Sequence, residues 1–278
     1  MGINLDQVRL HRPFMGHDGQ MHTRPGVGAS DQGVAGRYVS SGEVLPGGPV
    51  TAFRARRAAL SSAQRETWER LWPRLGMSVG AGPHPDTGPL DTRAWFGRDA
   101  PLVLEIGCGN GTSTLAMARE EPDIDVIAVE VYRRGLAQLL GAIDREQATN
   151  IRLIRGEAVY VLQRLMTPAA LSGVRVFFPD PWPKARHHKR RLLQPATIGL
   201  ITDRLRPGGV LHVATDHAGY AEQIAEAGDA EPRLRRVDPG QPDTQLPISV
   251  VRPTTKYETK AQDAGSAVVE LIWKKPEN

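Results

Sequence analysis

The sequence predicts an α/β domain in which a mostly parallel sheet carries helices on both faces. Short apolar runs alternate with helical segments between residues 101 and 216, a spacing typical of doubly wound sheets. Acidic residues follow several of these runs, at the edge where open α/β sheets bind their ligands. A glycine-rich loop separates the first run from the helix that follows it, and such loops let a ligand approach a helix N-terminus closely.

The expected elements can be placed in chain order. A short helix is expected over 64–72, because Ser61 can cap it and Gln64 stands three residues later, as in a capping box. The turn Pro207-Gly208-Gly209 leads into the fifth strand of the sheet. The five strands are expected at 102–106, 126–129, 151–154, 174–178 and 210–214. Helices are expected at 112–120, after Glu130 up to about residue 147, at 158–165 and at 196–204.

Composition limits the class of protein. The chain has 278 residues, is 40% hydrophobic and contains no apolar run of membrane-spanning length. Its lone Cys108 excludes an internal disulfide and is typical of a reducing compartment. We therefore expect a cytoplasmic protein without membrane attachment. The net charge of +4 permits a nucleic-acid partner without requiring one.

The first 50 residues differ from the rest. They contain 10 Gly and 4 Pro and show neither helical nor strand periodicity, the composition of a chain that cannot form a packed core. No apolar stretch suits a signal peptide. We expect a disordered N-terminal arm over 1–50, followed by a single domain over 51–278.

The segment Pro179-Asp180-Pro181-Trp182-Pro183 follows the fourth strand and is the most informative part of the sequence. Prolines end the strand ladder and restrict the backbone. They hold the carboxylate of Asp180 at the carboxyl end of a buried strand, which is the position expected for a catalytic acid.

A basic run follows this acid directly. Residues 184–191 contain five Lys or Arg, two His and no acid, a composition that favours contact with phosphates. The alternative is an edge loop with solvated charges, as most charge runs are. No other His or Cys cluster lies nearby in the sequence, so we expect no metal site at the two histidines.

Glu105 and the glycine spacing decide how the glycine loop is interpreted, whereas Glu130 fits either cofactor. The loop reads G-x-G-x-G over Gly107, Gly109 and Gly111, whereas a dinucleotide site has G-x-G-x-x-G. Glu105, two residues before the loop, would repel a pyrophosphate but attract the ammonium and sulfonium of S-adenosylmethionine. Glu130, at the end of the second strand, could accept from both ribose hydroxyls, in this cofactor or in NAD. S-adenosyl-L-methionine is favoured, and an NAD-linked oxidoreductase is the alternative.

The segments LEIGCGNG, AVEV, FFPDPWPKARHHKRRL, LRPGGVLHVATD and RPTTKYE resemble the bacterial tRNA (guanine-N7)-methyltransferases. These enzymes methylate a guanosine, position 46, in the tRNA variable loop. The resemblance extends from about Phe53 to Trp273. It implies a Rossmann-like class I methyltransferase with a seven-stranded sheet and an antiparallel C-terminal hairpin, for which compatible strands lie near Ser249–Val251 and Ala267–Trp273. It also implies tRNA as the partner and no obligate protein partner.

The resemblance implies a role for each matched residue. Asp180 is the catalytic acid and a cofactor contact, and Glu157 stands where the family usually has Asp beside the adenine. The remaining cofactor residues are Glu105, Gly107, Gly109, Gly111 and Glu130; the substrate residues are Lys184, Asp216, Thr255, Lys256, Tyr257 and Glu258; the RNA-binding residues are Arg186, His187, His188, Lys189, Arg190 and Arg191.

A non-catalytic RNA-binding module on the same fold is a further alternative. Such a module has no need for the three acids Glu105, Glu130 and Asp180, which therefore favour an enzyme.

The expected chemistry needs no general base, because guanine N7 has a free lone pair and no proton. A fixed carboxylate would stabilise the cationic purine that methylation produces.

Overall fold

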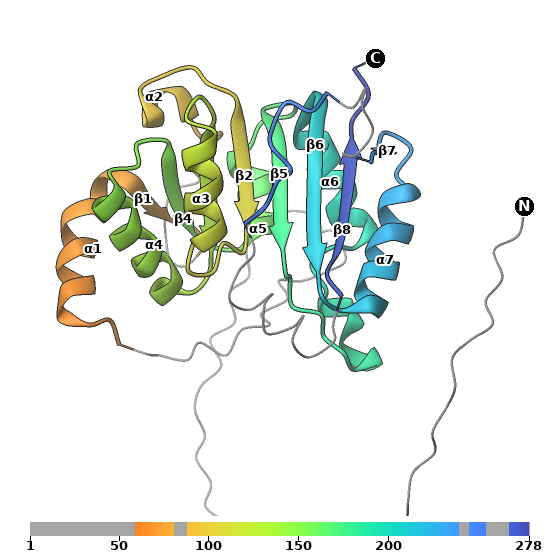
Figure 1. Ribbon diagram of the computed structural model, residues 1–278, viewed down its shortest axis with the longest axis horizontal. Helices are drawn as coiled ribbons and strands as arrows, with labels where there is room; N and C mark the ends of the chain where they lie inside the picture. Colours follow the sequence, from red (N-terminus) through yellow and green to blue (C-terminus); the bar gives the residue numbers. More distant parts are fainter. Residues whose placement is uncertain (1–58, 81–87, 239–244, 254–266, 278) are drawn as a thin grey trace, which may run out of the picture. The chain divides into compact units, whose positions relative to one another are not determined.

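The computed structural model describes residues 59–80, 88–238, 245–253 and 267–277 (Figure 1). The chain divides into two compact units, 1–49 and 50–278, and all described residues belong to the second. Its sheet has eight strands in the order β1-β4-β3-β2-β5-β6-β8-β7. The strands are β1 (Gly76–Ser78), β2 (Leu102–Ile106), β3 (Asp125–Glu130), β4 (Ile151–Arg155), β5 (Leu171–Phe177), β6 (Leu205–Thr215), β7 (Arg235–Arg236) and β8 (Val269–Lys274).

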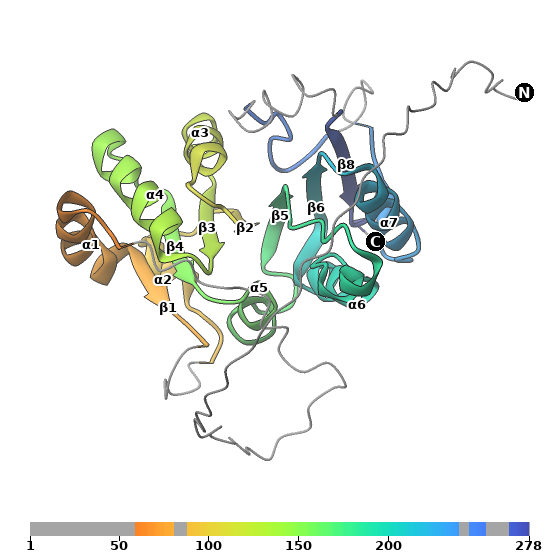
Figure 2. The same ribbon diagram turned by 90° about the horizontal axis from the view of Figure 1, so that it is seen from below.

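Helices cover both faces of this sheet (Figure 2). Side chains of α1, α3 and α4 pack on one face with Val103 and Val126, and those of α6 and α7 pack on the other with Leu104 and Val176. The helices are α1 (Ser62–Leu75), α2 (Thr92–Phe96), α3 (Thr112–Glu120), α4 (Arg133–Glu146), α5 (Ala158–Tyr160), α6 (Pro195–Arg204) and α7 (Ala218–Asp229), with a π-helical turn η1 (Val161–Leu165) and a 3-10 helix η2 (Ala185–Arg190).

The direction of winding reverses in the middle of the sheet. Strands β2, β3 and β4 follow one another toward one edge, whereas β5 and β6 follow one another toward the other edge. The pairs from β1 to β6 are all parallel, so the carboxyl ends of β2 to β6 share one edge. Open α/β sheets bind ligands at such a reversal, outside the strand ends, which here lies between β2 and β5.

The expected N-terminal capping box of α1 is confirmed. The Ser61 side chain accepts from the Gln64 N–H at 3.2 Å, and the Gln64 side chain accepts from the Ser61 N–H at 3.1 Å. Trp68 is buried and stacks on Trp72 with ring centroids 3.9 Å apart. The helix extends to Leu75, beyond the expected end, because its apolar face continues onto the sheet.

The C-terminal part differs from expectation. The described part of the chain forms a sheet of eight strands rather than seven, and Ser249–Val251 is not a strand. The backbone of Ser249 is bound by side chains instead, because Glu121 accepts its N–H and Arg175 donates to its C=O. The antiparallel partners of β8 are β6 and β7.

Two further differences come from tertiary contacts. The predicted turn Pro207-Gly208-Gly209 lies inside β6, where the pairing with β5 shifts register, so it acts as a bulge rather than as a strand boundary. The sequence analysis did not predict β1, β7, α2, α7 or η2. The three residues of β1 show no clear hydrophobic periodicity. They become a strand because they pair with the edge of β4 that β3 leaves free.

Candidate active site

The predicted acids are brought to the carboxyl edge of the sheet, the edge at which the arrowheads of β2, β5 and β6 lie in Figure 1. Glu105 lies near the end of β2 and Glu130 ends β3, while Glu157 follows β4. Asp180 follows β5 and Asp216 follows β6. Because the five strands are parallel, residues separated by more than 100 positions meet at this edge.

Glu130 joins the end of β3 to the glycine loop. Its Oε2 accepts from the Gly109 N–H at 3.0 Å, and its Oε1 accepts from the Val131 and Tyr132 N–H groups at 2.7 and 2.9 Å. Burial raises the pKa of Glu130, these backbone hydrogen bonds oppose the rise, and the charge of Asp180 adds to it. A carboxylate offers about four acceptor positions, so about one stays available for a ribose hydroxyl.

The three predicted glycines serve different purposes. A Cβ at Gly107 or Gly109 would meet no atom within 4 Å, and both have positive φ, 74° and 56°. Gly111 is tightly packed, since a Cβ there would lie 2.4 Å from Leu139 Cδ1. Gly135 of α4 was not predicted, yet its Cβ would lie 2.2 Å from the Gly109 carbonyl oxygen. The space beside Gly107 and Gly109 is therefore open to a ligand, whereas Gly111 and Gly135 let the loop pack closely against α4.

Glu105 is buried, with 3% of its surface exposed, and its Oε2 has no hydrogen-bond partner among the described residues. Burial raises its pKa to about 7, and the nearby cation of Arg175 opposes the rise. A buried unpaired carboxylate oxygen is costly unless a ligand satisfies it. Glu105, the open loop and Glu130 together fit a cationic cofactor with a ribose, as S-adenosylmethionine is.

Glu157 lies at the N-terminus of α5 and is exposed. Its pKa is raised by desolvation and by the charge of Glu130, which places the two carboxylates near each other. This position suits the predicted adenine contact. Glu157 is one methylene longer than the Asp usual in the family, but it offers the same carboxylate acceptors at this edge of the sheet.

Asp180 stands exposed on the loop after β5. The loop begins at Phe178, whose N–H donates to the Ala214 carbonyl of β6 at 2.8 Å. The charge of Asp180 contributes to the raised pKa values of Glu130 and Tyr132 on one side and of Tyr220 on the other. The exposed carboxylate of Asp180 therefore lies between Glu130 and Tyr132 on one side and Tyr220 of α7 on the other, where a macromolecular substrate can reach it.

The basic run divides into two parts. Arg186, Lys189 and Arg190 are exposed, and Arg190 lies 5.1 Å from the ring centroid of Trp182. His187 packs edge-on against the same ring. Arg191 was also predicted to bind RNA, yet only 4% of its surface is exposed, and its guanidinium donates to the Pro181 carbonyl and to Gln223 Oε1.

The remaining residues predicted to bind substrate or RNA differ in how exposed they are. Lys184 is the exposed residue before η2, and Asp216 is exposed between β6 and α7. His188 is partly buried, and its carbonyl accepts from Gln194 Nε2 at 2.8 Å. The segment Thr255, Lys256, Tyr257 and Glu258 lies outside the described residues.

Two residues of this edge were missed by the sequence analysis. Tyr132 is 39% exposed, and its pKa is raised by burial and by the charges of Asp180, Glu130 and Glu157. Its place two residues after Glu130 is a local signal that could have identified it. Arg252 lies 5.1 Å from the ring centroid of Phe178 and forms an ion pair with Glu270 at 2.9 Å, and no local pattern predicts that contact.

A family model described as "Putative methyltransferase" matches residues 99–271. The chain is 70% identical over 261 residues to a tRNA (guanine-N(7)-)-methyltransferase of Mycolicibacterium paratuberculosis, covering 93% of this chain and 99% of the relative. It is 66% identical over 264 residues to one of Mycobacterium bovis, covering 94% and 96%. The chain belongs to the tRNA (guanine-N7)-methyltransferase family.

This membership confirms the predicted enzyme class, an S-adenosylmethionine-dependent methyltransferase. The fold is also similar to an rRNA methylase structure from Streptococcus thermophilus, with 16% identity, a TM-score of 0.42 and coverage of 64% and 88% of the two chains. That likeness is too distant to bear on individual residues. The roles of single side chains in this methyltransferase therefore rest on its own geometry.

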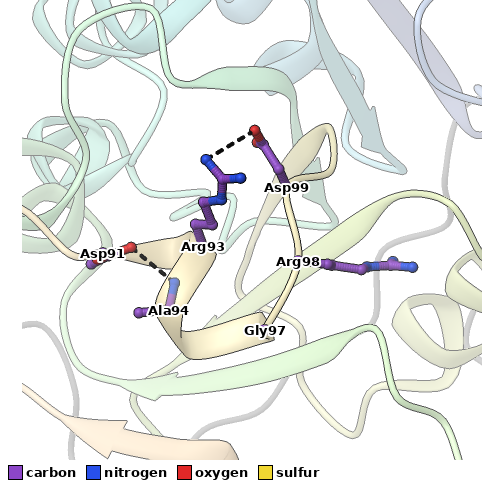
Figure 3. A pocket seen from close by; sticks show the side chains of 6 residues that line it. All are labelled: Asp91, Arg93, Ala94, Gly97, Arg98 and Asp99. Atoms are coloured by element: carbon purple, nitrogen blue, oxygen red, sulfur yellow. Dashed lines mark hydrogen bonds and ion pairs between the residues drawn. The ribbon is translucent and has the colours of Figure 1, made fainter.

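A hollow beside α2 lies apart from these acids (Figure 3). Its charged groups already have partners, since Asp91 accepts from the Ala94 N–H at 2.9 Å and Arg93 pairs with Asp99 at 3.6 Å. Arg98 is paired with Asp125. None of the residues that line it was predicted to bind cofactor or substrate. The candidate site of the methyltransferase is the carboxyl edge of the sheet.

Proposed function

We propose that this chain transfers a methyl group from S-adenosylmethionine to N7 of guanosine 46 in the variable loop of tRNA. The observation that carries the proposal is the meeting of buried and exposed acids where the winding reverses, with a basic surface beside them. Glu105 and Glu130 are buried, Asp180 is exposed, and η2 follows with its cations. The relatives named above are called tRNA (guanine-N(7)-)-methyltransferases, which supports the tRNA substrate and the N7 position.

The cofactor would be held by the β2–β4 half of the edge. When bound, S-adenosylmethionine supplies an electrophilic methyl group. Glu105 would face its cationic end, Glu130 a ribose hydroxyl and Glu157 the adenine. Gly107 and Gly109 leave the space that the ligand needs. These assignments use only groups that the fold already brings to one edge.

The remaining side chains would act on the substrate. Guanine N7 carries a lone pair and no proton, so alignment and charge stabilisation are the tasks left to the protein. Asp180 would stabilise the positive charge that develops on the purine. Asp216 could accept from the guanine N1–H or N2–H₂, and Lys184 would contact phosphate. The exposed cations of η2 would hold the backbone without selecting the base.

A tRNA substrate implies that the enzyme works in the cytoplasm, and the family relationship suggests that it acts without a second protein. Among the described residues, no helix is long and apolar enough to cross a membrane. The purified chain alone should therefore be active on unmodified tRNA.

The test combines purified protein, methyl-labelled S-adenosylmethionine and a tRNA transcript without modifications. Label should enter the RNA as 7-methylguanosine, and nucleoside analysis after digestion identifies the product. A matched transcript with adenosine in place of the variable-loop guanosine should take up no label. Cofactor binding without transfer would support the RNA-binding module instead, and label in another nucleoside would contradict the proposed position.

A further inference from the structure

The loop that carries Asp180 has few backbone donors of its own. Pro179, Pro181 and Pro183 have no N–H. Phe178 and Trp182 have positive φ values of 50° and 43°, a conformation unfavourable for side chains of this size. Such a backbone persists only where neighbouring groups hold it.

Within the described part of the chain, two hydrogen bonds hold this loop, one on each side of Asp180. Before it, the Phe178 N–H donates to the Ala214 carbonyl of β6 at 2.8 Å. After it, the Pro181 carbonyl accepts from Arg191 Nε at 2.8 Å. The second bond links Pro181, which directly follows Asp180, to the side chain of Arg191, ten positions later in the chain.

Arg191 is itself fixed by α7. Its Nη1 donates to Gln223 Oε1 at 2.6 Å and to the Gly219 carbonyl at 3.3 Å. Its guanidinium lies 4.7 Å from the ring centroid of Tyr220, whose hydroxyl accepts from the Leu193 N–H at 3.0 Å. The fork of the guanidinium thus spans the Asp180 loop and α7, the helix that begins just after Asp216. A lysine ammonium on a flexible stem lacks this planar fork.

We infer that Arg191 is a positioning residue that holds Asp180 in place relative to α7, and that it does not bind RNA. This inference rests on the proposed role of Asp180. It separates Arg191 from the exposed cations before it, which have the same charge but no contact with the loop backbone among the hydrogen bonds of the described residues. The last cation of the basic run therefore serves the catalytic carboxylate rather than the phosphates.

The decisive variant is Arg191→Lys, because it keeps the charge and removes the fork. A phosphate contact would tolerate this change, whereas a positioning contact would not. We expect kcat to fall roughly tenfold to a hundredfold, as small misplacements of catalytic groups cause. The dissociation constants for S-adenosylmethionine and tRNA, and the salt dependence of tRNA binding, should stay within about twofold.

The matched control is Arg204→Lys. Arg204 at the end of α6 donates its Nε to the Leu162 carbonyl at 2.7 Å, a similar bond with no link to the Asp180 loop. Its kcat should remain that of the unaltered protein. A second variant, Gln223→Leu, removes one acceptor of Arg191 and leaves the Pro181 contact in place. Gln223→Leu should lower kcat severalfold. If Arg191→Lys does not give a folded protein, this result alone tests whether Arg191 positions the Asp180 loop.

Asp180→Asn is measured in parallel, so that the two ideas are separable. A strongly reduced kcat in Asp180→Asn, a kcat reduced by about tenfold to a hundredfold in Arg191→Lys with unchanged affinities, and an unchanged kcat in Arg204→Lys together support the inference. Full kcat in Arg191→Lys and Gln223→Leu, or a loss confined to tRNA affinity, overturns it and leaves the role of Asp180 intact. Full activity of Asp180→Asn would reject the proposed role of that acid, and the inference with it.

Discussion

The two halves of the carboxyl edge hold their acids in different ways. In the β2–β4 half, Glu105 and Glu130 belong to buried strands, and Glu130 accepts from backbone N–H groups close to it in space. In the β5–β6 half, Asp180 lies beyond its strand, exposed, on a proline-rich loop tied down by Ala214 and Arg191.

This difference agrees with the ligands proposed for each half. A small cationic cofactor can be received by desolvated carboxylates, and burial raises the pKa values of Glu105 and Glu130. A large polyanion needs groups that protrude into solvent. An exposed acid gains little from its surroundings, so its place depends on how the loop backbone is held.

The largest effect is expected for Asp180→Asn, which keeps the shape of the side chain and removes its charge. The single-turnover rate should fall by about a hundredfold or more, since stabilisation of the developing charge is lost. Affinities for cofactor and tRNA should stay within about twofold. Asp99→Asn, an exposed acid paired with Arg93 beside α2, is the control. An unchanged rate in Asp180→Asn would remove this acid from the mechanism.

A smaller effect is expected for Glu130→Gln, which tests the cofactor half. The amide loses one acceptor oxygen and the charge, so its hydrogen bonds to the loop and to a ribose hydroxyl weaken. Charge-assisted hydrogen bonds contribute about 1.5–3 kcal/mol, and S-adenosylmethionine should therefore bind roughly tenfold to a hundredfold more weakly. Affinity for tRNA, measured without cofactor, should be retained. Equal losses for both ligands would indicate damage to the fold.

The third prediction concerns the exposed cations Arg186, Lys189 and Arg190. Changing all three to Gln should weaken tRNA binding and lower the slope of log K against log salt by about 0.9 for each phosphate that the protein no longer neutralises. Cofactor affinity should not change. The control replaces Arg93, Arg119 and Arg164, which are exposed elsewhere, and carries the same change in net charge. An unaltered slope would mean that the run is only a solvated surface.

The smallest effect is a pH dependence that originates at Glu105. Its pKa is raised to about 7 by burial, so below pH 7 the side chain is neutral in the folded protein without cofactor. Binding of a cation favours the carboxylate, and cofactor affinity should fall by up to about tenfold per pH unit below 7 and level off above it. Titration calorimetry at several pH values measures this. Glu105→Gln should bind more weakly and show a flat profile, and a flat profile in the unaltered protein would contradict the prediction.

The same shift has a consequence for stability. The folded state holds the Glu105 proton more tightly than the unfolded chain, where the pKa is 4.5. Its contribution to stability is therefore complete at low pH and is lost as the pH rises from about 4.5 to about 7. A bound cation at this acid would offset the loss, because it compensates the buried charge.

Much of the fold could be read from local pattern. The strands around Glu105, Glu130 and Asp180 are short apolar runs, and their ends coincide with acids or glycines. Since parallel strands place their carboxyl ends at one edge, chain order alone predicted that these acids would meet. The capping box at Ser61 needed only a spacing of three residues, and it is confirmed.

What the sequence determined by itself was the run of parallel strands from β2 to β6, the edge at which they end and the acids that reach it, because hydrophobic period and turn chemistry act over a few residues. Arg190 and Arg191 show what only the tertiary structure decided. They are adjacent and identical in type, yet one is exposed and the other is buried beside α7. The approach of Tyr220 and Gln223 from α7, a helix about 30 positions later in the chain, makes that difference. Desolvation and pairing of a charge depend on such distant neighbours, and no local pattern encodes them.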